Sequence, residues 1–146
     1  MNRNLTVGLV IAAIAGLLFS FPSSGSAGDV LIISNKSVSA DSLTNDDVKK
    51  IFIGKKTRWD DNKKISFVLM DSNGVHKDFL REYVKRTPAQ YRRFWKKQVF
   101  TGKGRRPISF KVEKDMIEYV ANTSGAIGYI SASAATDGVK VLSINF

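Results

Sequence analysis

The chain has no cysteine and a single histidine, His76, among its 146 residues. Without cysteine, a disulfide scaffold, a thiolate metal site and a cysteine nucleophile are all excluded. With one histidine, a zinc site would depend mainly on carboxylates, which is unusual. Ser124, His76 and Asp71 could be written as a Ser-His-Asp set, but no nucleophile-elbow motif accompanies them. We therefore expect no enzyme, no cofactor and no metal site.

Acidic residues are also scarce, with 13 Asp and Glu against 23 Lys and Arg, so the net charge is +10. This surplus favours an anionic partner, although it can also serve only to keep the surface soluble. The run 91–97 alternates aromatic and basic residues as nucleic-acid binders do. Helical spacing turns its aromatic residues inward, so we do not expect nucleic acid as a partner. In the loop 101–107, Lys103, Arg105 and Arg106 either bind phosphate or are simply solvated.

Only one long apolar run exists, Leu5–Phe21. Arg3 precedes it, and a Pro-Ser-Ser break and small residues ending at Ala27 follow it. This pattern predicts a signal peptide over residues 1–27, with an uncleaved membrane anchor as the alternative. Residues 28–146 then form one domain without a membrane span. The absence of cysteine is consistent with the bacterial periplasm.

Apolar β-branched runs alternate with helical patterns along the rest of the chain. This alternation predicts an α/β fold, with a mixed sheet flanked by helices. We expect strands at 29–34, 65–70, 126–130 and 139–144, and helices at 45–53, 75–84, 88–99 and 113–122. Ligands of such sheets bind at the carboxyl ends of strands, beside helix starts. The loop 71–74 has this position, and Ser124-Gly125 lies at the entry to a strand.

Local signals support these elements. Thr44 and Thr87 are expected to cap helix starts. Gly125 is expected to adopt a left-handed conformation as a helix C-cap, and Gly128 to mark either close backbone approach within a strand or a bulge. Helical spacing predicts that the inward-facing residues of the helix 88–99 are Tyr91, Phe94, Trp95 and Val99. The two tryptophans, Trp59 and Trp95, are expected to be packing residues.

Three segments together resemble a known family. The first segment is Leu43-Thr44, followed by Ile51–Gly54 and then by Arg58-Trp59-Asp60. The second is a strand, a polar turn and Phe79 on the next helix. The third is Gly125–Tyr129. Their order and spacing resemble the phosphate-type substrate-binding proteins of bacterial ABC transporters. The resemblance implies a periplasmic-binding-protein-like fold. Family members have two lobes around phosphate, whereas this chain is long enough for one.

The resemblance also implies where an anion would bind, although the family's phosphate loop is altered here. Asp71 and Gly74 match the family pattern. Leu69 stands where an arginine is expected, and Asn73 and Val75 replace a serine and a threonine. Each charge-assisted hydrogen bond lost in this way removes roughly 1.5–3 kcal/mol. The altered loop therefore predicts weak anion binding, or a half-site that a second protein completes.

Two functions follow as hypotheses. In the first, the chain is an exported solute-binding-like protein for phosphate or another small oxyanion, with a transporter or a second-lobe protein as partner. Its predicted ligand-binding residues are Asp71, Ser72, Asn73, Gly74, Val75 and His76. Within this set, His76 either faces the anion or is a solvated surface group. In the second hypothesis, the chain is a basic interaction module for a polyanion or an acidic protein.

Overall fold

The computed structural model describes residues 29–71 and 74–146, which form one six-stranded sheet with the order β2-β6-β1-β5-β3-β4. Strand β1 is antiparallel to both of its neighbours, β5 and β6, and the other pairings are parallel. The strands are β1 (Val30–Ser34), β2 (Ser42–Thr44), β3 (Ser66–Met70), β4 (Ile108–Phe110), β5 (Ala126–Ser131) and β6 (Lys140–Asn145).

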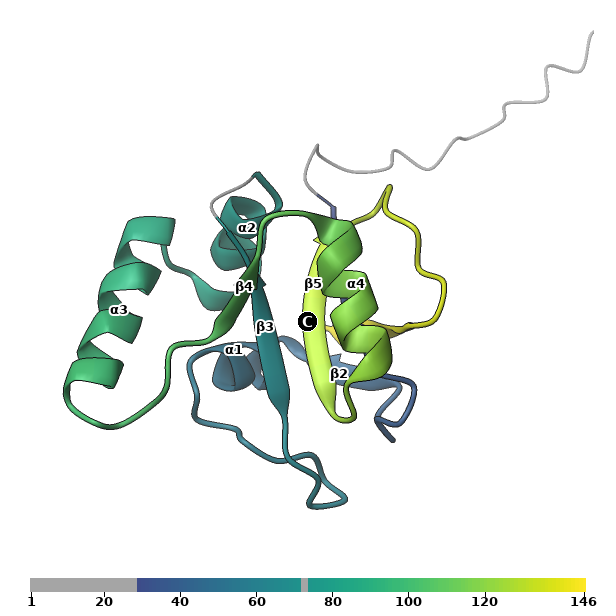
Figure 1. Cartoon of the computed structure of the whole chain (residues 1–146), viewed down its shortest axis with the longest axis horizontal. Helices are drawn as coiled ribbons and strands as arrows, with labels where there is room; N and C mark the ends of the chain where they lie inside the picture. The colour runs from purple at the N-terminus through teal and green to yellow at the C-terminus, as the bar shows by residue number, and fades with distance from the viewer. Residues whose placement is uncertain (1–28, 72–73) are drawn as a thin grey trace, which may run out of the picture.

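Helices cover both faces of this sheet (Figure 1). Helix α4 packs on β5 and β3 at one face, and α1 and α2 lie at the other, while α3 lies to one side of the β3–β4 end. The helices are α1 (Asn45–Phe52), α2 (Gly74–Phe79), the π-helical segment η1 (Leu80–Val84), α3 (Pro88–Phe100) and α4 (Glu113–Asn122).

The predicted α/β fold is therefore confirmed, with three differences in detail. The short strands β2 and β4 were not predicted, because three residues are too few to show a period. The helix predicted over 75–84 is divided, since its second half is π-helical. The leader predicted over residues 1–27 lies outside the described residues.

Helix starts follow the predicted capping chemistry. The Thr44 hydroxyl accepts from the Asp47 amide, and the Asp47 carboxylate accepts from the Thr44 amide. Thr87 and Gln90 repeat this reciprocal pair at the start of α3. Both helix starts are thereby fixed by residues that can be recognised in the sequence.

Gly128 lets α4 approach the sheet closely. A Cβ atom at this position would lie 2.8 Å from the Met116 sulfur and 3.2 Å from Cγ2 of Val68. The next residue of β5, Tyr129, faces the opposite side, where its ring stacks on Phe79 at a centroid distance of 3.8 Å. The predicted close approach at Gly128 is confirmed.

Gly125 has the predicted left-handed conformation, with φ at 74°, but its role differs from the predicted C-cap. The cap of α4 is Thr123, two residues earlier. A Cβ atom at Gly125 would lie 2.3 Å from the Lys64 carbonyl oxygen, and the Trp59 indole donates to the Gly125 carbonyl at 3.0 Å. Gly125 thus lets the start of β5 pass against the segment that leads into β3.

The last turn of α3 was predicted wrongly. Tyr91 and Trp95 are buried as expected and Phe94 is half-buried, but Val99 is 45% exposed and the adjacent Phe100 is 92% exposed. Trp95 is the last residue of the helix that contacts the sheet side of the core, 5.6 Å from the Phe67 ring between centroids. Beyond that contact the helix extends past the core, so the apolar period no longer points to a buried surface.

The Gly125→Ala variant is expected to lose more stability than Gly102→Ala, as measured by urea unfolding. Both glycines are left-handed, and this conformation costs an alanine about 1–2 kcal/mol. An added Cβ meets nothing within 4 Å at Gly102 but meets the Lys64 carbonyl at Gly125. The overpacking adds about 1–3 kcal/mol at Gly125 alone. Equal losses in the two variants would contradict the close approach.

Candidate functional site

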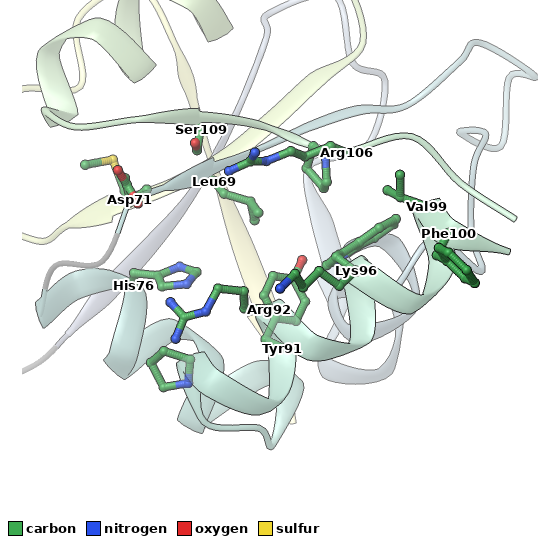
Figure 2. A pocket seen from close by; sticks show the side chains of 14 residues that line it. Leu69, Asp71, His76, Tyr91, Arg92, Lys96, Val99, Phe100, Arg106 and Ser109 are labelled. Atoms are coloured by element: carbon green, nitrogen blue, oxygen red, sulfur yellow. The ribbon is translucent and has the colours of Figure 1, made fainter. Parts of the chain in front are cut away.

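A groove of about 500 Å³ separates α3 from the β3–β4 end of the sheet (Figure 2). We call it the α3 groove. Its volume falls in the range of small-molecule sites. Helix α3 lines one side with Pro88, Tyr91, Arg92, Trp95, Lys96, Val99 and Phe100. The rest of the lining comes from β3, β4, α2 and the adjoining loops: Leu69, Met70, Asp71, His76, Arg106, Pro107 and Ser109.

The helical period gives α3 two neighbouring ridges along this groove. Tyr91, Trp95 and Val99 follow one another at intervals of four residues and form an apolar ridge. Arg92 and Lys96, each one position further on, form a basic ridge beside it. Residues four apart lie on the same face of a helix, so each ridge runs along α3 without interruption. Both ridges line the same groove.

The groove carries a surplus of positive charge. Arg92 and Lys96 come from α3, and Arg106 comes from the loop before β4. Figure 2 shows Arg92 extending toward His76, while Arg106 extends along the opposite wall. Within residues 29–71 and 74–146, none of these three cations forms an ion pair with a carboxylate. Among the described residues, Asp71 is the only acidic one that lines the groove.

His76 is held at the inner end of the groove by Tyr129. The Tyr129 hydroxyl accepts from the Met70 amide at 2.9 Å and lies 2.5 Å from Nδ1 of His76. All three groups are satisfied when the hydroxyl donates its proton to Nδ1, which places the imidazole proton on Nε2. This arrangement selects the neutral form of the ring.

The electrostatic surroundings favour the same form. Burial lowers the pKa of His76 to about 4, the nearby Asp71 carboxylate acts to raise it, and the Arg92 guanidinium acts to lower it. His76 is therefore uncharged near neutral pH and can offer an anion only a hydrogen bond, not a positive charge.

The interpretation of His76 as a solvated surface group is wrong, because its side chain is only 8% exposed. The helical period contained the signal for its burial. Counting from position 76, Phe79, Leu80 and Tyr83 lie three, four and seven residues later on the same buried face.

Of the four residues of the predicted ligand loop that the structure describes, Asp71 and His76 line the groove. Gly74 begins α2 as an exposed residue, and Val75 is half-buried outside the lining. Ser72 and Asn73 lie outside the described residues.

The hypothetical Ser-His-Asp set is not assembled. Ser124 precedes the first residue of β5, whereas Asp71 follows the last residue of β3. Because β5 and β3 are parallel neighbours, Ser124 lies near the amino ends of these strands and Asp71 lies near their carboxyl ends.

Arg92 and Lys96 were not predicted as site residues, and Arg106 was expected either to bind phosphate or to be solvated. On the sequence, Arg92 and Lys96 belong to a basic helix face and Arg106 to a basic loop, and both patterns are typical of solvated surface. All three side chains are indeed exposed, but they share one groove. The four-residue interval between Arg92 and Lys96 is the one signal that could have linked two of them.

Comparison with known proteins identifies what the fold is similar to. The sequence model of a family described as PBP superfamily domain matches residues 26–143. No curated protein sequence matches the chain. Among solved structures, an ABC-type phosphate transport receptor from Vibrio cholerae shares 19% identity and a TM-score of 0.59, covering 79% of this chain and 45% of its own.

Two other solved structures give the same result. PstS from Borrelia burgdorferi has 24% identity and a TM-score of 0.60, with coverage of 80% of this chain and 47% of its own. A putative phosphate ABC transporter substrate-binding protein with bound phosphate from Clostridium perfringens has 21% identity and a TM-score of 0.62, with coverage of 79% and 44%. The chain thus spans less than half the length of these proteins, and the predicted periplasmic-binding-protein-like fold is confirmed.

Two further searches concern the described residues alone. None of the helices in residues 29–71 and 74–146 combines the length and apolar character needed to cross a bilayer. The same part of the chain contains no cluster of three or more His, Asp or Glu side chains able to hold a metal ion.

Stability is expected to fall as the pH is lowered from 6.5 to 4, and the His76→Gln variant should lack part of this fall. The folded-state pKa of about 4 lies below the unfolded value of 6.5, so the unfolded chain binds more protons in this window. The difference amounts to about 3 kcal/mol at pH 4.

Urea unfolding of both proteins at several pH values provides the measurement. The substitution leaves every carboxylate of the chain in place, so the difference between the two pH profiles reports on His76. Parallel profiles would show that His76 is not held neutral by its surroundings.

Proposed function

Because the chain belongs to the PBP superfamily, we propose that it is an exported binding protein that takes an oxyanion into the α3 groove. The single observation that carries this proposal is the convergence of Arg92, Lys96 and Arg106 on one groove without a carboxylate partner in the described residues. A bound oxyanion supplies the missing negative charge.

The arrangement of the cations favours an oxyanion over a simple halide. Guanidinium groups bind carboxylate and phosphate through parallel hydrogen bonds, and Arg92 and Arg106 reach the groove from opposite walls. Lys96 adds a charge that adjusts through its flexible stem. Arg92 and Lys96 repel each other across one helical turn, and an anion between them relieves that repulsion.

The affinity for a small oxyanion is expected to be modest. The cations are exposed, and water and salt screen charges at a surface. Leu69 lines the groove in place of the arginine that the family resemblance would put there. Solved relatives described as phosphate-binding or phosphate-transport proteins are more than twice as long as the matched part. We therefore propose that a transporter or a second-lobe protein completes the site.

The location and class of the protein are part of the same proposal. The leader that the sequence predicts over residues 1–27 supports export to the periplasm. The similarity to proteins described as transport receptors and substrate-binding proteins supports binding rather than catalysis. The second candidate is a basic module for an acidic protein or a polyanion, which the net charge of +10 favours. Such binding should weaken steeply as ionic strength rises.

Phosphate and sulfate are expected to raise the thermal midpoint of unfolding more than chloride does at matched ionic strength. The Arg92→Gln/Lys96→Gln double variant should lose this difference. The matched control is Arg93→Gln/Lys97→Gln, which removes the same charge from exposed positions of the same helix that do not line the groove.

Differential scanning fluorimetry over a concentration series of each salt provides the measurement. Removing both groove cations should weaken the apparent affinity for phosphate by about tenfold or more, given two charge-assisted contacts. Equal shifts with the three anions, or equal losses in the two double variants, would overturn the proposal.

A further inference from the structure

We propose that the natural occupant of the α3 groove is an organic anion, in which an oxyanion head group is joined to an apolar body. This inference rests on the proposed function and specifies its ligand class. It follows from the apolar residues of the groove, which an inorganic oxyanion leaves uncovered.

The apolar residues of the groove differ in exposure, since Leu69 and Trp95 are buried whereas Val99 is 45% exposed. Leu69 provides an apolar residue on the strand side, opposite Trp95 and Val99 on α3. Phe100 extends this surface at the end of the helix, where its side chain is 92% exposed. Large apolar side chains gathered at one exposed site mark a binding surface more often than chance. A ligand that covers them removes apolar surface from water and gains affinity.

The two ends of the groove differ in charge. Asp71 and His76 lie at one end, and Val99 and Phe100 lie at the other, with the basic residues between them (Figure 2). The Asp71 carboxylate repels an anionic head group, and the neutral His76 ring adds no attraction between charges. The head group therefore lies at Arg92, Lys96 and Arg106, and the apolar body extends toward Phe100.

The size of the groove supports this class of ligand. A volume of about 500 Å³ lies within the range of sites for organic ligands, and such sites combine mostly apolar walls with a few polar groups that fix orientation. Inorganic phosphate fills only a small fraction of that volume. The parallel ridges of α3 place apolar and basic side chains side by side along the whole groove, as a ligand of mixed character requires.

The experiment compares inorganic phosphate, 1-naphthyl phosphate and 1-naphthol by isothermal titration calorimetry on the purified chain. We expect 1-naphthyl phosphate to bind at least about tenfold more tightly than inorganic phosphate, because its ring covers the apolar wall. We expect 1-naphthol, which lacks the charge, to bind more weakly than 1-naphthyl phosphate. Phe100→Ser should weaken the binding of 1-naphthyl phosphate by about threefold or more and leave the binding of inorganic phosphate unchanged.

Phe146→Ser is the matched control, because Phe146 is also an exposed phenylalanine, at 85%, but does not line the groove. Both side chains are largely exposed, so neither substitution is expected to affect folding. Arg92→Gln/Lys96→Gln should weaken the binding of both phosphates.

The possible failures are distinguishable. Equal affinity for the two phosphates, with both dependent on Arg92 and Lys96, would overturn this inference and leave the proposed function intact. Binding of neither phosphate would overturn both proposals. Equal affinity for 1-naphthol and 1-naphthyl phosphate would show that the charge of the ligand does not contribute to binding, and it would overturn this inference. If sedimentation velocity shows a dimer that Phe100→Ser converts to a monomer, the occupant is a second copy of the chain, and the inference is wrong.

Discussion

The hydroxyl group of Tyr129 determines where the groove begins. It accepts a hydrogen bond from the Met70 amide at the carboxyl end of β3 and contacts Nδ1 of His76 on α2. The ring of the same residue stacks on Phe79, also on α2. Both polar contacts are buried, and a buried polar group left unpaired is costly, so the three segments are held in one arrangement. These contacts position His76 at the inner end of the groove.

The remaining geometry follows from how α3 is attached to this centre. Tyr91 donates to the Phe52 carbonyl at 2.6 Å, which fixes the first half of α3 to the end of α1. Trp95 adds a ring contact with Phe67, and no residue after it is buried in α3. The last turn therefore projects beyond the core with Val99 and Phe100 exposed. An anchored helix with a projecting end creates the open, apolar part of the groove.

The sequence allowed the fold to be predicted more fully than the site. Caps at Thr44 and Thr87, and close approach at Gly128, depend on neighbouring residues or on a single missing Cβ, and all were recognised. The groove instead joins α3 to β3 and β4, whose packing no local pattern specifies. Arg92 is a surface arginine by every sequence criterion, and only the tertiary structure gives it a position opposite Arg106.

The chemistry of Leu69 connects the altered loop to the groove. A phosphate site built on buried donors gains affinity from fixed hydrogen bonds, whereas a leucine offers none. Here the positive charges are instead on exposed side chains at the groove walls, and Leu69 lines the groove opposite Trp95. Exposed cations attract many oxyanions with little discrimination, since water competes for each contact. Selectivity in such a site must come from the apolar surface, because apolar contact distinguishes an organic anion from an inorganic one of the same charge. The loss of the arginine and the exposure of Phe100 therefore act in the same direction, away from a bare inorganic anion.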